Sequence, residues 1–148
     1  MKEIINKNII YAKSNNSISD VSKLMKKYNI GFIPIKDNEK YIGVITDRDI
    51  ALSIPTLKST SDSVEPYITK DIISIDINKT VDDALDLMSK RKVKRLLIKE
   101  KDSIIGVLSL SDILNYKNNN KIIDTCKSIF EISDNTRELL SNINDFKL

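Results

Sequence analysis

The sequence predicts an α/β (α+β) protein made of two tandem β-α-β-β-α repeats, packed with pseudo-two-fold symmetry and followed by a C-terminal helical tail. The first observation is an internal repeat: residues 42–50 recur as residues 105–113, at a constant offset of about 60 residues without gaps. Two of the three glycines, Gly43 and Gly106, occupy the same point of the two copies. One such unit cannot cover its own apolar face, so the two must pack together. A ligand site is therefore expected at their seam, and in duplicate.

The second observation is that each copy begins in the same way. A short apolar step, Ile9–Ile10 or Ile72–Ile73, is expected to be a strand. A Ser/Thr-x-x-Asp pattern follows at residues 17–20 and 80–83, where a hydroxyl and a carboxylate can satisfy the free N–H groups of a first helical turn. The helices predicted there carry apolar residues on one face, namely Val21, Leu24, Met25 and Tyr28, and then Ala84, Leu87 and Met88.

The third observation is a pair of short apolar runs after each of these helices. The runs are residues 32–35 and 41–45 in the first copy, and residues 95–98 and 104–108 in the second, with polar turn residues between them. A second helix is then predicted to begin near Asp47 and near Leu110. The glycine of each second run removes a side chain where backbone or a ligand comes close.

These elements divide the chain into four parts. The first repeat is predicted at residues 1–54, a linker at 55–63, the second repeat at 64–117 and a helical extension at 118–148. The extension has helical spacing in its apolar residues, which are Ile122, Ile123, Cys126, Ile129 and Phe130. On that face Cys126 is expected to be a buried small hydrophobic residue.

Composition excludes several classes of function. The chain has no histidine and a single cysteine, so the usual general base, zinc ligand, disulfide and Cys-based metal site are all missing. We therefore predict no catalytic residue and no metal site. The net charge of +3 is weak and its lysines are scattered, which makes nucleic acid an improbable partner. No stretch is long and apolar enough to cross a bilayer, so a cytoplasmic location is the default expectation.

Candidate binding residues lie where each second run ends and the next helix begins. They are Thr46 with Asp49, and Ser109 with Ser111 and Asp112. Unpaired N–H groups and the helix dipole favour an anion there, a hydroxyl can donate to a phosphate, and a carboxylate can accept from the two hydroxyls of a ribose. An ordinary helix cap explains the same pattern. Two copies in register weaken that explanation, because a cap does not require the glycine as well.

A basic pair opens one strand of the second copy. Lys94 and Arg95 stand where the first copy has Gly31 and Phe32. They are either a solvated strand edge or a phosphate clamp, with Arg95 as a planar fork and Lys94 as a point charge. Arg48 could do the same for the first copy.

The repeated Gly-h-h-Ser/Thr-x-x-Asp pattern, where h is an apolar residue, resembles a pair of cystathionine-β-synthase (CBS) domains, also called a Bateman module. The resemblance covers about residues 1–117. Residues 43–49 are similar to the motif of the inosine-monophosphate-dehydrogenase type. Residues 92–96 and 106–114 resemble the nucleotide-binding repeats in the γ subunit of AMP-activated protein kinase, which has histidine where this chain has Lys94.

The resemblance implies that an adenine nucleotide such as AMP, ADP or ATP, or else S-adenosylmethionine or NAD, binds in two clefts between the repeats. In one cleft, it implies ribose contacts for Asp112, phosphate contacts for Ser109, Ser111, Lys94 and Arg95, and base contacts for Ile10 and Gly31. In the other cleft, it implies ligand contacts for Thr46, Arg48 and Asp49, and it places Ile73 and Val93 near the base. Because the basic pair is assigned to the first of these clefts, we expect a phosphorylated ligand at the Asp112 site.

The function expected from this resemblance is that of a stand-alone regulatory module, not an enzyme. It would sense an adenine nucleotide, require no cofactor, form a homodimer and change its association with an unknown effector protein. Two alternatives stay open: a ligand-free structural dimerisation module, and a small transcription or nucleic-acid regulator.

Overall fold

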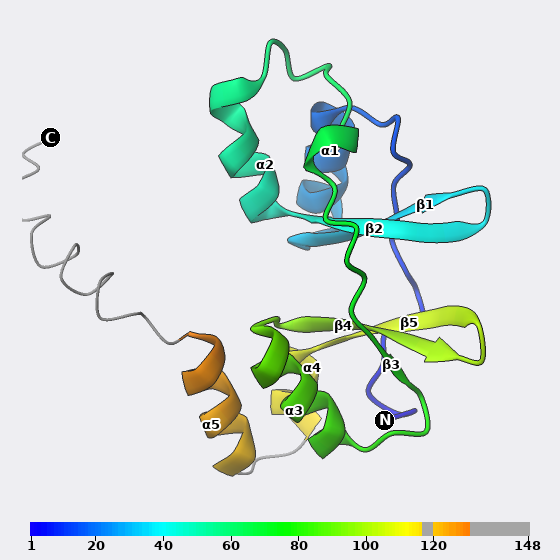
Figure 1. Ribbon diagram of the computed structural model, residues 1–148, viewed down its shortest axis with the longest axis vertical. Helices are drawn as coiled ribbons and strands as arrows, with labels where there is room; N and C mark the ends of the chain where they lie inside the picture. The colour runs from blue at the N-terminus through cyan, green and yellow to red at the C-terminus, as the bar shows by residue number, and fades with distance from the viewer. Residues whose placement is uncertain (117–119, 131–148) are drawn as a thin grey trace, which may run out of the picture.

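The computed structural model of the chain describes residues 1–116 and 120–130. Two α/β layers face each other across a seam, with the strands of each repeat turned toward the seam and the helices on the outer sides (Figure 1). The N-terminus lies beside the second repeat, far from the helices of the first (Figure 1). The predicted fold class and the packing of two repeats are confirmed.

The element order follows the prediction in most places. The first repeat holds α1 (Ile18–Tyr28), β1 (Phe32–Asp37), β2 (Lys40–Thr46) and α2 (Asp47–Ser53). Two short 3₁₀ turns, η1 (Ile54–Thr56) and η2 (Glu65–Tyr67), follow α2. The second repeat holds β3 (Ser74–Asp76), α3 (Val81–Arg91), β4 (Arg95–Glu100), β5 (Ser103–Ser109) and α4 (Leu110–Tyr116), and α5 (Asn120–Ile129) follows.

The predicted first strand lies later than expected in both repeats. In the second, β3 begins at Ser74, after Ile72–Ile73, and pairs in parallel with β4; Leu97 N–H donates to the carbonyl of Ile73 at 3.1 Å. In the first, only an isolated parallel bridge joins Ala12 to Ile35, and no strand forms at Ile9–Ile10. The pairing is shorter there because Pro34 occupies the position of Leu97 and has no N–H to donate.

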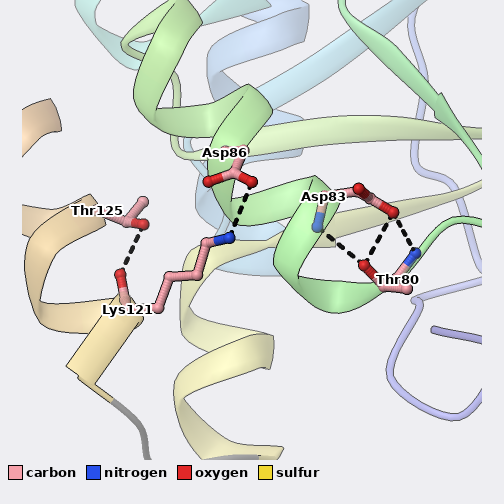
Figure 2. A network of polar contacts seen from close by, with 5 residues as sticks. All are labelled: Thr80, Asp83, Asp86, Lys121 and Thr125. Atoms are coloured by element: carbon pink, nitrogen blue, oxygen red, sulfur yellow. Dashed lines mark hydrogen bonds and ion pairs between the residues drawn. The ribbon is translucent and has the colours of Figure 1, made fainter.

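The helix starts at Ser17 and Thr80 form as the sequence predicts. Each hydroxyl accepts from the backbone N–H of the aspartate three residues on, at 3.0 Å in both helices, while the aspartate accepts from the backbone of the cap. Figure 2 shows this reciprocal pair for Thr80 and Asp83. Hydrogen bonds from Thr80 to the carboxylate lower the pKa of Asp83 below its ordinary value.

The two cores exchange segments across the seam. Met1, Ile4 and Ile5 pack against the core of the second repeat, whereas the core of the first repeat includes Val64 and contacts Ile68. The start of the chain is thus part of the second half, and the start of the second repeat is part of the first half. Neither repeat can be cut out at its sequence boundary without losing core contacts.

This exchange explains the repeated strand glycines. Thr69 pairs with Val44 through two backbone hydrogen bonds of 2.9 Å, directly beside Gly43. A Cβ on Gly43 would lie 2.7 Å from the carbonyl oxygen of Thr69 and 2.3 Å from Cγ2 of Ile68. At Gly106 the same role falls to Asn6, whose carbonyl oxygen would lie 3.0 Å from an added Cβ. Of the two expectations for these glycines, the structure shows close approach of the backbone.

The C-terminal extension begins with α5, which lies beside α3 (Figure 1). Ile122 is buried in the core of the second repeat and Cys126 is half-buried against it. An ion pair of 2.8 Å joins Lys121 to Asp86 of α3 (Figure 2). The predicted helix is confirmed over α5, and residues 131–148 lie outside the described part of the chain. Among the described residues, no helix has the length and apolar character needed to cross a membrane.

Candidate functional site

A cavity of about 350 Å³ opens at the seam between the repeats. The first repeat contributes the start of β1, one position of β2 and the β2–α2 junction. The second contributes the segment before β3 and the residues between α3 and β4. Its lining residues are Gly31, Phe32, Val44, Thr46, Asp47, Arg48, Asp49, Thr69, Asp71, Ile73, Lys92, Val93, Lys94 and Arg95.

Most of the predicted site residues meet in this one cavity. The lining includes Gly31, Thr46, Arg48, Asp49, Ile73, Val93, Lys94 and Arg95. It does not include Ile10, Ser109, Ser111 or Asp112. At the constant offset of the repeat, these four residues are the counterparts of Ile73, Thr46, Arg48 and Asp49, which do line the cavity.

The basic pair lies between the two junctions. Lys94 and Arg95, which were expected to serve the Asp112 cleft, line the cavity that contains Thr46 and Asp49. They also adjoin the β5–α4 junction, because Leu110 N–H donates to the Lys94 carbonyl at 2.8 Å and Arg95 pairs with Ser109. They reach the Thr46–Asp49 cavity because the start of β4 faces the start of β1 across the seam. The guanidinium carbon of Arg95 lies 5.9 Å from the centroid of the Phe32 ring. Side chains at the start of one repeat's strand therefore complete the site of the other repeat.

The β2–α2 junction holds its carboxylate in a fixed position. Asp49 Oδ2 accepts from Thr46 N–H at 2.8 Å and from Thr46 Oγ1 at 2.7 Å, while Asp49 N–H donates to Thr46 Oγ1 at 3.2 Å. Within the described residues, the hydrogen bonds of this carboxylate all use Oδ2. Oδ1 is thus the atom through which Asp49 could accept from a ligand hydroxyl.

The β5–α4 junction repeats this geometry. Asp112 Oδ2 accepts from Ser109 N–H at 2.8 Å and from Ser109 Oγ at 2.5 Å, and Ser111 Oγ lies 2.8 Å from Ser109 Oγ. The cap explanation of the motif is therefore correct in both copies. The ligand explanation is compatible with it, because the cap uses one carboxylate oxygen and orients the other.

The charge of the cavity is mixed, with a basic excess. Four cationic side chains, Arg48, Lys92, Lys94 and Arg95, face three carboxylates, Asp47, Asp49 and Asp71. Arg91 forms an ion pair with Asp71. Apolar walls come from Val44, Ile73 and Val93. Such a combination of apolar walls with a few convergent charged groups is typical of a small-molecule site, and the excess of cations favours an anionic ligand.

Sequence reasoning missed Asp47, although it stands inside the repeated motif, between Thr46 and Asp49. At the constant offset Asp47 aligns with Leu110, which is buried, so the two junctions differ in charge. The Asp47 carboxylate occupies the space beside Gly31, because a Cβ on Gly31 would lie 2.4 Å from Asp47 Oδ2. Asp71 and Lys92 were also missed, because neither belongs to the repeated motif. In residues 1–116 and 120–130, no group of three or more acidic or cysteine side chains could hold a metal ion.

Comparison with known proteins gives the same fold and repeat. A family model described as the CBS domain matches residues 1–55 and 64–119. The CBS domain-containing protein YhcV of Bacillus subtilis is 27% identical over 114 residues, which are 76% of this chain and 81% of that protein. An inosine-5′-monophosphate dehydrogenase of Methanocaldococcus jannaschii is 29% identical over 114 residues, but the match spans only 22% of that enzyme.

Among solved structures, the CBS domain pair of protein MJ0100 superimposes with a TM-score of 0.69 and 29% identity, covering 78% of this chain and 92% of that one. That pair was crystallised in complex with methylthioadenosine and S-adenosyl-L-methionine. The family model accounts for both repeats and for more than half of the chain. Together with the duplicated fold and the seam cavity, these matches show that the chain belongs to the CBS domain family.

Proposed function

We propose that this chain is a regulatory module that binds an adenine nucleotide in the seam cavity. One observation carries the proposal: Thr46 and Asp49 of the first repeat share a cavity with Lys94 and Arg95 of the second. A hydrogen-bond acceptor for the ribose hydroxyls and hydrogen-bond donors for the phosphates thus line the same cavity. Its volume of about 350 Å³ is within the range of small-ligand pockets, roughly 300–1,000 Å³.

In this arrangement each part of the nucleotide has a chemical partner. Oδ1 of Asp49 accepts from the ribose hydroxyls, and the base lies against Ile73 and Val93. The phosphates lie between Lys94 and Arg95, where charge-assisted hydrogen bonds are strongest. We propose the Asp49 cavity as the principal site, and the Asp112 junction, with Ser109, Ser111 and Ile10, as a second site of lower affinity for phosphate.

The ligand acts by shifting a population of arrangements. The cavity draws on both repeats, so a bound ligand favours one mutual placement of them. A coupling of about 1–3 kcal/mol is enough for a useful response. Leu52 and Ile54 of the first repeat are 64% and 66% exposed, and they supply an apolar surface through which a homodimer or an effector protein would sense that response.

A second candidate ligand is a sulfonium or thioether nucleoside. Two observations favour it: the related MJ0100 pair was crystallised with such ligands, and Asp47 and Asp71 place carboxylates in the cavity that would accept from an ammonium group or balance a sulfonium. The arginine and lysine side chains favour the phosphorylated ligand, which we therefore place first.

Isothermal titration calorimetry with AMP, ATP, adenosine and S-adenosylmethionine tests the proposal. The informative variant is Asp49→Asn, which keeps an acceptor oxygen for the cap and removes the charge that the ribose would use. We expect a loss of affinity of at least about tenfold, the equivalent of one charged hydrogen bond. The matched control, Asp112→Asn, leaves the principal site intact. Absence of binding by every ligand, or equal affinity of Asp49→Asn and wild type, would overturn the proposal.

A further inference from the structure

Two lysines of the seam cavity contact the C-terminal end of α5. Lys92 Nζ donates to the carbonyl oxygen of Ser128 at 2.5 Å and to its Oγ at 2.8 Å. Lys94 Nζ lies 4.1 Å from the centroid of the Phe130 ring. Both lysines also line the cavity. Lys94, which would receive the ligand's negative charge, therefore also contacts the end of this helix, and Lys92 lines the same cavity.

The other end of α5 is fixed independently of the cavity. Lys121 pairs with Asp86 of α3, and Thr125 Oγ1 donates to the carbonyl oxygen of Lys121 at 2.8 Å (Figure 2). Ile122 is 1% exposed in the core of the second repeat. The helix is thus anchored at its first turns by packing that a ligand would not touch.

The attachment at the C-terminal end is partly electrostatic. Ser89 Oγ donates to Ser128 Oγ at 2.8 Å and Ile129 packs against the second core, and the two lysines add charged contacts. A lysine ammonium that donates to the last carbonyls of a helix is favoured by the helix dipole, as Lys92 does at Ser128. Phe130 is 55% exposed, and the ammonium of Lys94 lies over its ring. A cation above an aromatic face is attracted by the ring quadrupole, and the contact is lost when the cation moves away.

We propose that the end of α5, from Ser128 to Phe130, is a sensor that competes with the ligand's phosphates for Lys92 and Lys94. The inference rests on the proposed function. Phosphate oxygens in the cavity draw the two ammonium groups inward, away from Phe130 and Ser128, and the end of the helix is released. Because coupling between two binding events is reciprocal, the docked helix end weakens phosphate binding by the same factor.

The affinity of the cavity provides one test. Phe130→Ala removes the ring that competes for Lys94, so the affinity for ATP is expected to rise about two- to fivefold, the equivalent of a cation–π contact at an exposed site. The affinity for adenosine, which has no phosphate, is expected to stay unchanged. Ile123→Ala is the matched control, since Ile123 lies on the same helix and is 51% exposed.

A fluorescence measurement tests the release directly and without assuming a nucleotide. The chain has no tryptophan, so Phe130→Trp introduces a single reporter that keeps the cation–π contact. Its emission is expected to change on titration with ATP and with inorganic tripolyphosphate, but not with adenosine. The change is expected to disappear when Lys94→Met is added.

The outcomes separate the two proposals. A response to tripolyphosphate without any binding of ATP would support the sensor and overturn the nucleotide as the ligand. Binding of ATP that leaves the reporter unchanged, with equal affinity in wild type and Phe130→Ala, would overturn the sensor and leave the proposed function standing. A protein that responds to neither anion would overturn both.

Discussion

Gly43 and Gly106 occupy equivalent positions but face different constraints, and alanine at each measures the difference. A Cβ at residue 43 would lie 2.3 Å from Ile68 Cγ2 and 2.7 Å from the Thr69 carbonyl oxygen. At residue 106 the closest atom would be the Asn6 carbonyl oxygen, at 3.0 Å. At residue 43, the clash with Ile68 can be relieved by a side-chain movement, whereas the clash with the Thr69 carbonyl oxygen requires the Thr69 backbone to move.

Moving Thr69 breaks or stretches the two backbone hydrogen bonds that it exchanges with Val44. Overpacking of this kind costs about 1–3 kcal/mol, and a weakened backbone hydrogen bond adds about 1 kcal/mol. We therefore expect Gly43→Ala to lower the free energy of unfolding by roughly 2–4 kcal/mol. Gly106→Ala needs a shift of only a few tenths of an ångström and is expected to cost about 1 kcal/mol or less.

Urea unfolding of wild type and both variants, followed by circular dichroism, measures these costs. Alanine also stiffens the unfolded chain relative to glycine, but this gain is the same at both sites and cancels in the comparison. Equal destabilisation of the two variants, or a larger effect at residue 106, would refute the account in which the glycines make room for the exchanged segments.

Three further predictions address the helix α5, the helix caps and the basic pair. Ile122→Ala is expected to lower the free energy of unfolding by about 2–5 kcal/mol, because Ile122 is buried and truncation leaves a cavity. Ile123→Ala, at an exposed position, should change it by less than about 0.5 kcal/mol. Equal losses of stability in the two variants would contradict the packing of α5 on the second core. Hydrogen bonds from Thr80 lower the pKa of Asp83. The stabilisation from the Asp83 carboxylate is therefore complete above the pKa of the unfolded state, near 3.8, and is lost as the pH falls below it. The free energy of unfolding should fall less steeply with acid in Thr80→Ala than in wild type, and an unchanged slope would show that the cap does not stabilise the charge. Arg95→Ala is expected to weaken AMP about tenfold, the equivalent of one charged hydrogen bond, while adenosine is unaffected; an equal loss for both ligands in calorimetry would show that Arg95 does not contact phosphate.

Local signals predicted most of the fold. The duplicated pattern around Gly43 and Gly106 predicted two packed repeats, and the Ser/Thr-x-x-Asp patterns placed the starts of α1 and α3 at the residues where the structure has them. These features depend on residues close in sequence, or on the repeat itself. The strands expected at Ile9–Ile10 and Ile72–Ile73 were wrong in position, since the paired residues lie just after them in both repeats. In the first repeat Pro34, more than twenty residues away, also shortens the pairing, and the apolar pattern of the segment contains no information about that partner.

Most members of the candidate site were predictable, but the approach of Lys94 and Arg95 to the Thr46–Asp49 junction was not. The motif identified both junctions, at Thr46 and Asp49 and at Ser109 and Asp112. Which junction receives Lys94 and Arg95 depends on how β4 faces β1 across the seam, and this is a property of the packing of the repeats. The link from Lys94 to Phe130 was likewise beyond prediction, since the tail lies outside the repeat and has no counterpart in the first half.

The central claim is that one ligand is held between the two repeats by residues of both. A crystal structure of the chain grown with AMP tests it most directly. The account predicts density in the seam cavity, with the ribose at Asp49 Oδ1 and the phosphate between Lys94 and Arg95. Well-ordered crystals with that cavity empty at saturating AMP, or with AMP bound elsewhere on the chain, would contradict it.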